Sequence, residues 1–497
     1  MTTSGSSGRG VKASSVKRGA LGGFQDLARA ATTTRVNPWR LVGAGLRYGP
    51  HFGALLAASA RRFGPATALI DEFGSMSYTD LWLLASSLDL GAEPVAIRCG
   101  DNRWLLAGVA GAALGGADVT LLGPHAASAT GHARVLGHTE LEAARAPASS
   151  PGRRVPSLTL MTTGSTGAPK PVERKRFTAA HVLPAASLVA ALGLRPGEPV
   201  LILPPLFHGH GFSLAAACLL VGAPIILGPT ASAVSLVRQH SVGLIAGVPA
   251  QLAGLVGEDL APVRLVAAGS ARLPSPLAAA LLETVELVDF FGSTETGTAT
   301  IARAADLRAG TVGRPAAGVR LSIVDDAGVV VPRGDEGWVT VRSALSFAGR
   351  SRLRTGDRGS LDHEGRLTLT GRADGVIVSG GENLNAHTLR TYIESQPEVD
   401  DAHVTVVHDE RLDSALAARV VLNAPLTASA LCERVRAEIG RHYVPRDLVI
   451  ERASGAFQEV AYEKSALPTA MPPFGISSIH VLPGARVTGL PSTVVST

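Results

Sequence analysis

The sequence has few of the residues that build disulfide frameworks or metal clusters. Its 497 residues include only three cysteines, Cys99, Cys218 and Cys432. They are far apart and odd in number, which argues against a disulfide framework and against a zinc site. A protein without disulfides fits a reducing compartment, so we expect a cytoplasmic protein.

Long hydrophobic runs are also missing. The two most apolar stretches are residues 105–123, which contain Asp118, and residues 213–228, which are interrupted by Gly222-Ala223-Pro224. Neither supplies the ~20 apolar residues that a membrane-spanning helix needs. The first 20 residues lack the apolar core of a secretory signal. We therefore predict a protein that is not transmembrane, and contact with a membrane surface stays open.

Charge and aromatic side chains are sparse as well. The net charge is +5, aromatic residues make up 4% of the chain, and the basic residues form no cluster. A nucleic-acid partner is not expected, because it would need a concentrated basic field. The chain has only five lysines. Chemistry that needs a primary amine therefore has few candidates.

What the chain does contain is enough apolar material for a large core, at 46% of its residues. Helical patterns at 53–62 and 78–90 alternate with short apolar strands at 67–70, 95–98, 118–122, 200–203, 224–227 and 244–247. This alternation predicts the α/β class, with helices covering parallel sheets.

The pattern changes after about residue 310. Short strands at 319–324, 329–331 and 338–341 predict an antiparallel, barrel-like piece, and the segments that follow predict a strand at 367–370, a strand at 376–378, a helix at 387–395 and a strand at 404–408. We expect a poorly ordered leader at 1–35, a large N-terminal domain at 36–371 and a small α+β lid domain at 372–497.

One loop carries an unusual density of anion-binding groups. An apolar run at 158–161 leads directly into Thr162-Thr163-Gly164-Ser165-Thr166-Gly167-Ala168-Pro169-Lys170. Glycines let backbone N–H groups approach phosphate oxygens, hydroxyls donate further hydrogen bonds, and the lysine adds a positive charge. The spacing is not that of a Walker A loop. Taken alone, the segment is also compatible with a flexible surface loop.

The loop resembles the phosphate-binding loop of the adenylate-forming superfamily, which includes acyl-CoA synthetases, luciferases and peptide-synthetase adenylation domains. Phe291-Gly292-Ser293-Thr294-Glu295 is similar to a second motif of that family. The resemblance implies that Thr162, Thr163, Gly164, Ser165, Thr166, Gly167 and Lys170 bind ATP. It also implies that Thr294 lies near the phosphates and that Glu295 holds Mg²⁺.

Further motifs follow in the family order. Leu353-Arg354-Thr355-Gly356-Asp357 resembles the segment whose aspartate binds the ribose, and Gly371-Arg372-Ala373-Asp374 resembles the hinge between the domains. Pro205-Leu206-Phe207-His208 resembles the segment whose histidine lines the acyl and CoA channels. By this match Asp357 and Arg372 bind the nucleotide, Asp374 is the pivot, and His208 belongs to the catalytic set. The sequence departs from the family at Pro171, where glycine is usual, and at Leu353, where tyrosine is usual.

The family places a catalytic lysine near the C-terminus, and its usual motif is absent here. Lys464 is the only lysine after residue 175 and lies 92 residues beyond Arg372. A lysine at this place would stabilise the negative charge that builds up on the α-phosphate. We predict that Lys464 has this role. The alternative is a solvated helix lysine on a module that has lost its catalysis.

The resemblance implies an AMP-forming acid–thiol ligase that uses ATP, Mg²⁺ and coenzyme A. The small apolar segments 246–249, 267–269 and 297–299 predict room for an apolar acid, and we expect a fatty acid. Two alternatives stay open. In the first, the acyl-adenylate is passed to a carrier protein. In the second, the chain is a catalytically impaired homologue that only binds nucleotide or acyl-adenylate.

Overall fold

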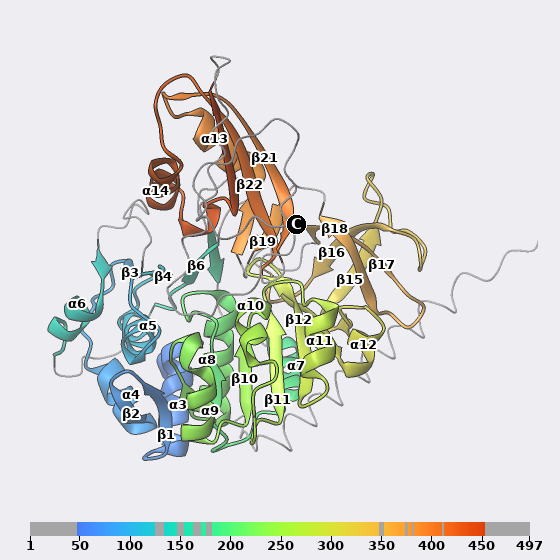
Figure 1. Cartoon of the computed structure of the whole chain (residues 1–497). Helices are drawn as coiled ribbons and strands as arrows, with labels where there is room; N and C mark the ends of the chain where they lie inside the picture. The colour runs from blue at the N-terminus through green and yellow to red at the C-terminus, as the bar shows by residue number, and fades with distance from the viewer. Residues whose placement is uncertain are drawn as a thin grey trace, which may run out of the picture. The chain divides into compact units, whose positions relative to one another are not determined.

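The computed structural model describes residues 47–124, 134–146, 154–162, 170–174, 181–346, 352–372, 376–379, 382–409 and 412–452 (Figure 1). These residues form two compact units, and the boundary between the units lies between Asp374 and Gly375. No helix of the described part of the chain is long and apolar enough to cross a membrane.

The first unit is built around a nine-stranded sheet. In spatial order its strands are β14 (Arg314–Pro315), β13 (Gly297–Arg303), β12 (Glu286–Ser293), β11 (Leu265–Gly269), β10 (Leu244–Gly247), β8 (Val200–Ile202), β9 (Ile225–Ile226), β1 (Thr67–Asp71) and β2 (Gly74–Ser77). The strands from β12 to β1 run parallel, and the strands at both edges are antiparallel. The strands that follow β8 in the chain, β9 and β10, lie on opposite sides of it. The order in which successive strands are added across the sheet therefore reverses at β8.

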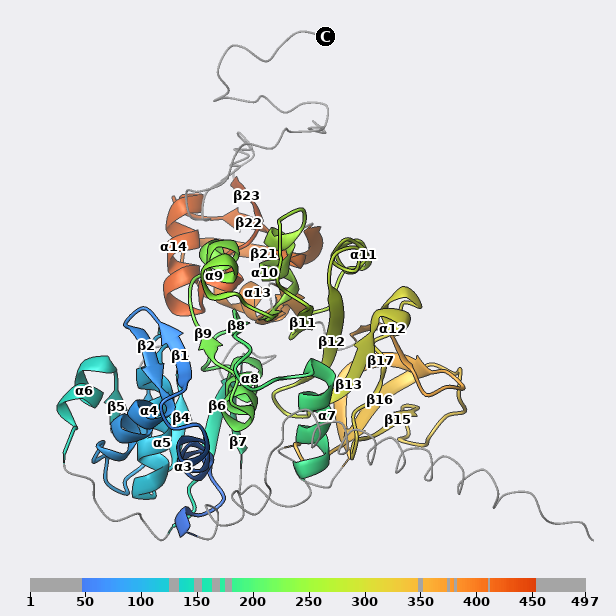
Figure 2. The same ribbon diagram turned by 90° about the horizontal axis from the view of Figure 1, so that it is seen from below.

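Helices cover both faces of this sheet. Side chains of β8, β10, β11 and β12 alternate between two apolar clusters, as a sheet buried on both faces requires. One face carries α3 (Phe52–Phe63), α7 (Val182–Leu192) and α8 (Gly209–Val221), and the other carries α9 (Ala233–His240), α10 (Pro249–Leu252) and α11 (Ser275–Leu281). Figure 2 shows α8 and α9 on opposite sides of the strands. The predicted α/β class is confirmed.

A second sheet of the first unit has the order β5 (Val135–Leu136), β3 (Val95–Ile97), β4 (Val119–Leu121), β6 (Leu158–Thr162) and β7 (Lys170–Arg174). All but β7 are parallel. The helices α4 (Tyr78–Ser86), α5 (Arg103–Gly115) and α6 (His138–Ala143) belong to this region. The α3, α5 and α8 side chains join this sheet and the large sheet in one apolar cluster. Because β3, β4 and β6 run parallel, their carboxyl ends lie at the same edge of the sheet.

The third sheet is antiparallel and has four strands, β15 (Arg320–Val324), β16 (Gly337–Arg342), β17 (Leu353–Leu361) and β18 (Leu367–Arg372). It confirms the predicted change of architecture after residue 310. The predicted strand at 329–331 is wrong, because only an isolated bridge between Val324 and Val330 forms there. The short helix α12 (Ala304–Arg308) connects β13 and β14 of the large sheet.

The second unit is a small α+β module. Its sheet has the order β20 (Glu382–Asn385), β19 (Val376–Ser379), β22 (Asp413–Leu422) and β21 (Val399–Asp409), and β23 (Asp447–Arg452) pairs with β22. The helices α13 (Ala386–Glu394) and α14 (Ala428–Glu438) pack their apolar sides against it in a separate core. The predicted helix at 387–395 and the strands at 376–378 and 404–408 are confirmed.

Candidate active site

The predicted phosphate loop joins two antiparallel strands. Thr162 is the last residue of β6 and Lys170 is the first residue of β7, and the two are paired across the hairpin. The loop ends are thus placed at the carboxyl end of a parallel strand, where α/β folds bind ligands. The predicted ligands Thr163, Gly164, Ser165, Thr166 and Gly167 lie outside the described residues.

Thr294 and Glu295 occupy the turn between β12 and β13. The Thr296 hydroxyl accepts a hydrogen bond from the Ser293 N–H at 2.9 Å and donates one to the Gly297 carbonyl at 2.9 Å. These bonds fix the turn from within. Thr294 and Glu295 are both half-buried at its tip. Their side chains can therefore be held in place and still be reached by a ligand.

The glycine of this motif is required by close packing. A Cβ atom on Gly292 would lie 2.1 Å from the Gly297 carbonyl oxygen, so any other residue would force the hairpin apart. The preceding Phe291 packs against Val341 in one apolar cluster and against Val339 in another. Phe291 thereby links the turn to the antiparallel sheet that carries the predicted ribose-binding residue.

The amino-terminal end of α8 brings three predicted parts of the site together. His208 immediately precedes the helix, and the next residue, Gly209, lies against two other segments. A Cβ atom on Gly209 would be 3.5 Å from the Leu160 side chain on β6 and 3.6 Å from the Thr294 side chain. The His208 segment, the strand that leads into the phosphate loop and the Thr294–Glu295 turn therefore meet at one place.

A second histidine of the same helix contacts the carboxyl end of β11. The His210 Nδ1 lies 2.9 Å from the Ser270 Oγ, and the ring fills the space beside Gly269. Its Nε2 is fully buried and has no hydrogen-bond partner among the described residues. Burial, followed by the nearby imidazole of His208, lowers the pKa of His210 to about 4. The ring is therefore neutral at physiological pH.

The predicted ribose and hinge residues face each other across two strands. Asp357 on β17 is paired directly with Arg372 at the end of β18. Asp357 is buried, and its N–H donates to the Thr355 hydroxyl at 3.2 Å. The structure thus brings together two residues from separate predicted motifs. The predicted pivot Asp374 lies outside the described residues, as does Lys464.

One buried carboxyl was not found by sequence reasoning. Asp289 lies on β12, two residues before Phe291, and is only 4% exposed. Its Oδ1 has no hydrogen-bond partner among the described residues. Burial raises the pKa of Asp289 to about 7, and a backbone hydrogen bond with Phe290 opposes part of that shift. The available signal was a single acidic residue inside the apolar run 287–291.

Glu295, on the β12–β13 turn, suits a cation that is shared with phosphate. No group of three histidine, cysteine, aspartate or glutamate side chains within the described ranges could hold a metal ion. Mg²⁺ commonly binds one or two carboxylates and completes its shell with phosphate oxygens and water. Glu295, half-buried on a rigid turn, fits that kind of shared site.

Two glycines of the segments predicted to make room for the acid are closely packed. A Cβ atom on Gly247 would lie 2.7 Å from the Leu252 side chain, and one on Gly269 would lie 2.9 Å from the His210 ring. Because Gly247 and Gly269 have no side chains, Leu252 and His210 can pack against the carboxyl ends of β10 and β11. Room for an apolar acid beside the segments 246–249, 267–269 and 297–299 stays a prediction.

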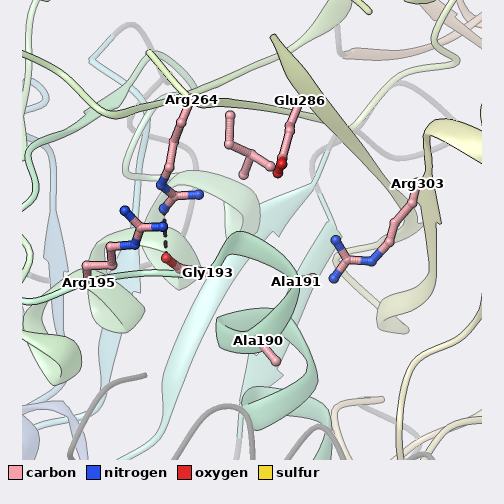
Figure 3. Close-up of a pocket in the computed structure, with 8 residues that line it drawn as sticks. Ala190, Ala191, Gly193, Arg195, Arg264, Glu286 and Arg303 are labelled. Atoms are coloured by element: carbon pink, nitrogen blue, oxygen red, sulfur yellow. Dashed lines mark hydrogen bonds between the residues drawn. The ribbon is translucent and has the colours of Figure 1, made fainter. Parts of the chain in front are cut away.

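The structure also contains a hollow of about 420 Å³, which lies elsewhere (Figure 3). It is lined by Leu265 and Glu286, the first residues of β11 and β12, and by the arginines Arg195, Arg264 and Arg303. The Arg264 guanidinium is fixed by Glu198 and by the Gly193 carbonyl. This hollow is at the amino ends of the parallel strands, opposite the edge that carries His210, and is not the site described above.

Comparison with known proteins agrees with these motifs. Residues 130–349 match the family model described as AMP-binding enzyme. The chain is 29% identical over 312 residues to a 2-succinylbenzoate–CoA ligase of Bacillus cereus, and 29% identical over 327 residues to an indoleacetate–CoA ligase of Aromatoleum aromaticum. These matches cover 58% and 60% of this chain, and 64% of each relative.

Solved structures share the fold. An o-succinylbenzoate CoA synthetase of Bacillus subtilis, bound to a product analogue, aligns with a TM-score of 0.70 at 22% identity, covering 80% of this chain and 94% of that one. Another structure of that enzyme, in complex with ATP and magnesium, aligns with a TM-score of 0.59 at 22% identity, covering 80% and 95%. The chain therefore matches the AMP-binding enzyme model over residues 130–349, shares the fold of o-succinylbenzoate CoA synthetase and is similar in sequence to two CoA ligases.

Proposed function

We propose that this protein is an ATP-dependent, AMP-forming acid–thiol ligase that activates a carboxylic acid as an acyl-adenylate and transfers the acyl group to coenzyme A. The observation that carries the proposal is the meeting of β6, the amino-terminal end of α8 and the β12–β13 turn around Gly209. Three motifs spread over residues 160 to 294 supply one site. The 2-succinylbenzoate and indoleacetate ligases support the same reaction class.

Each part of the site has a definite task in this reaction. The segment from Thr162 to Lys170 would bind the phosphates, and Thr294 would donate a hydrogen bond to one of them. The carboxylate of the acid attacks the α-phosphorus, and pyrophosphate leaves. Asp357 would accept hydrogen bonds from the ribose hydroxyls, and Arg372, paired with it across the strands, would add a positive charge. Lys464 would stabilise the charge on the α-phosphate.

Glu295 would hold Mg²⁺ against the phosphates. The bound ion would neutralise charge on the leaving pyrophosphate, which is the usual contribution of a divalent cation to phosphoryl chemistry. The Thr296 hydrogen bonds would keep this carboxylate in position, because they fix the turn that carries it.

For the acid we propose a substrate with an aromatic ring, which replaces the fatty acid expected from the sequence. Both relatives are named for such acids, 2-succinylbenzoate and indoleacetate. The half-buried ring of His208 lies against Phe207, with 4.4 Å between the ring centroids, next to the place where the acid must approach the phosphates. A flat acid could pack against this pair.

Acid-dependent exchange of labelled pyrophosphate into ATP tests the proposal. The panel contains indoleacetate, 2-succinylbenzoate, benzoate and straight-chain acids from acetate to palmitate. We expect exchange with at least one aromatic acid and thioester formation when coenzyme A is added. Exchange with long straight-chain acids alone would restore the fatty-acid prediction, and transfer to a carrier protein but not to coenzyme A would change the acceptor.

A matched pair of variants locates the activity. Glu295→Gln keeps the shape of the side chain but removes its charge, so exchange should fall by about 100-fold or more, because a cation ligand is lost. Glu286→Gln changes an exposed glutamate at the other end of the same strand, β12, and should retain wild-type exchange. Equal activity of both variants would refute the assigned role of Glu295.

A further inference from the structure

The loop that carries His208 is held by the second sheet of the first unit. This loop, residues 203–208, leaves the carboxyl end of β8, where the chain reverses direction across the large sheet. Such reversals are where α/β proteins bind ligands. The position of the loop therefore bears directly on the site.

Two neighbouring residues of the loop contact the carboxyl ends of two neighbouring strands. The Leu206 N–H donates a 2.6 Å hydrogen bond to Asp101 Oδ1, which follows β3. A Cβ atom on Gly123, which follows β4, would be 3.1 Å from the Phe207 ring. Since β3 and β4 are adjacent and parallel, both contacts come from one edge of the sheet.

Asp101 has an unusual combination of properties. The residue as a whole is exposed, but burial of its carboxyl raises the pKa of that group. The Leu206 hydrogen bond and the nearby imidazole of His208 lower the pKa of Asp101 and so oppose part of that rise. Asp101 therefore bonds to the backbone of the loop and lies near the imidazole of its histidine.

We propose that Asp101 is a positioning residue for the ligase reaction: its carboxylate anchors the Leu206 N–H and so holds His208 and the start of α8 against the Thr294–Glu295 turn. The carboxylate is not needed to cap α5, because the Asn102 side chain already caps the amino-terminal end of that helix and accepts from the Trp104 N–H at 3.1 Å. The effect on catalysis, though not the anchoring, rests on the proposed function.

Asp101→Ala and Asp101→Asn separate anchoring from charge. Asparagine keeps an oxygen that accepts from the Leu206 N–H, whereas alanine removes it. A displacement of about 1 Å at a reacting group costs on the order of 100-fold in rate. We therefore expect Asp101→Ala to lower kcat for acid-dependent adenylation by about 10- to 100-fold, with the KM for ATP changed by less than about threefold, and Asp101→Asn to recover most of the loss.

Asp118 provides the matched control. Its Oδ1 accepts from the Ser157 N–H at 2.7 Å, the same kind of carboxylate–amide anchor, but it precedes β4 and lies at the opposite end of that strand. Asp118→Ala should leave kcat unchanged, even if it lowers the melting temperature. Equal losses of kcat in Asp101→Ala and Asp118→Ala would show a general structural effect and overturn the proposal.

A double-mutant cycle tests whether Asp101 acts through His208. If it does, Asp101→Ala should reduce kcat by less than about threefold in a His208→Ala background, because coupled residues do not contribute independently. Losses that multiply in the double variant would contradict the proposed route.

Amide hydrogen exchange of the full-length protein provides a readout that needs no activity. The peptide covering residues 203–209 should exchange faster in Asp101→Ala than in the wild type, and at the wild-type rate in Asp101→Asn and Asp118→Ala. Unchanged exchange in Asp101→Ala would overturn the anchor itself. If the wild type activates no acid while this exchange pattern is found, the proposed function fails and the anchor stands.

Discussion

The replacement Asp289→Asn should remove a strong pH dependence from the stability of the first unit. Asp289 is 4% exposed on β12, and its Oδ1 lacks a hydrogen-bond partner in the described part of the chain. Burial raises the pKa of its carboxyl from 3.8 in the unfolded chain to about 7. The native state therefore keeps a proton that the unfolded state loses at much lower pH.

The sign and size of the effect follow from this difference. Between pH 4 and pH 7 the native state binds more protons at Asp289 than the unfolded state, so this residue's contribution to stability falls as the pH rises. A difference of about three pKa units corresponds to roughly 4 kcal/mol of unfolding free energy between pH 4 and pH 8. The asparagine variant has no such titration. Any cost of its unpaired amide, about 1–3 kcal/mol, does not change with pH and drops out of the slope.

Urea unfolding of both proteins at several pH values between 4.5 and 8, followed by tryptophan fluorescence, measures the effect. The three tryptophans among the described residues, Trp82, Trp104 and Trp338, lie in the first unit, together with Asp289. The variant should gain stability relative to the wild type steadily as the pH rises. A difference between the two proteins that stays constant within about 1 kcal/mol across this range would refute the assignment of a buried, proton-retaining carboxyl.

Two further predictions concern His210 and Lys464. The pKa of His210 falls to about 4 in the folded protein, so its contribution to stability should rise as the pH increases from 4 to 6.5, opposite in sign to that of Asp289. His210→Gln should flatten this rise in the same urea experiment, and an unchanged slope would show that the ring is not buried as a neutral group. Lys464→Ala should lower acid-dependent pyrophosphate exchange by at least about 100-fold and leave thioester formation from a supplied acyl-adenylate nearly intact, because the lysine stabilises charge only in the first half-reaction. Lys175→Ala is its control, and wild-type rates of both half-reactions in Lys464→Ala would remove Lys464 from the mechanism.

Local sequence patterns predicted many strands of the fold well. The apolar runs at 244–247 and 200–203 became β10 and β8, because strands buried on both faces are continuous apolar segments. The strand at 329–331 was wrong, since three apolar residues after a turn formed a single bridge and left Val329 and Val330 exposed. Short apolar segments therefore predict strands reliably only when both faces are covered.

The site was predictable as motifs but not as an arrangement. The resemblance identified His208, Thr294 and Asp357 one by one. The association of His208 with Thr294 depends on the order of strands in the large sheet and on close contacts at Gly209, neither of which a linear pattern contains. The hydrogen bond between Asp101 and Leu206 joins residues 105 positions apart and has no local signal at all. Asp289 did have a local signal, because it is the only carboxyl in an apolar run, but sequence reasoning did not identify it.

The central claim is that the acid is activated by attack of its carboxylate oxygen on the α-phosphorus of ATP. An acid carrying ¹⁸O in both carboxylate oxygens tests this directly, once the panel has identified a substrate. When the thiol of coenzyme A attacks the acyl carbon, the bond between that carbon and the bridging oxygen breaks, and AMP leaves with one labelled oxygen. Mass spectrometry should therefore find one ¹⁸O in AMP and none in pyrophosphate. Label in a released phosphate, or ADP as the nucleotide product, would contradict the account.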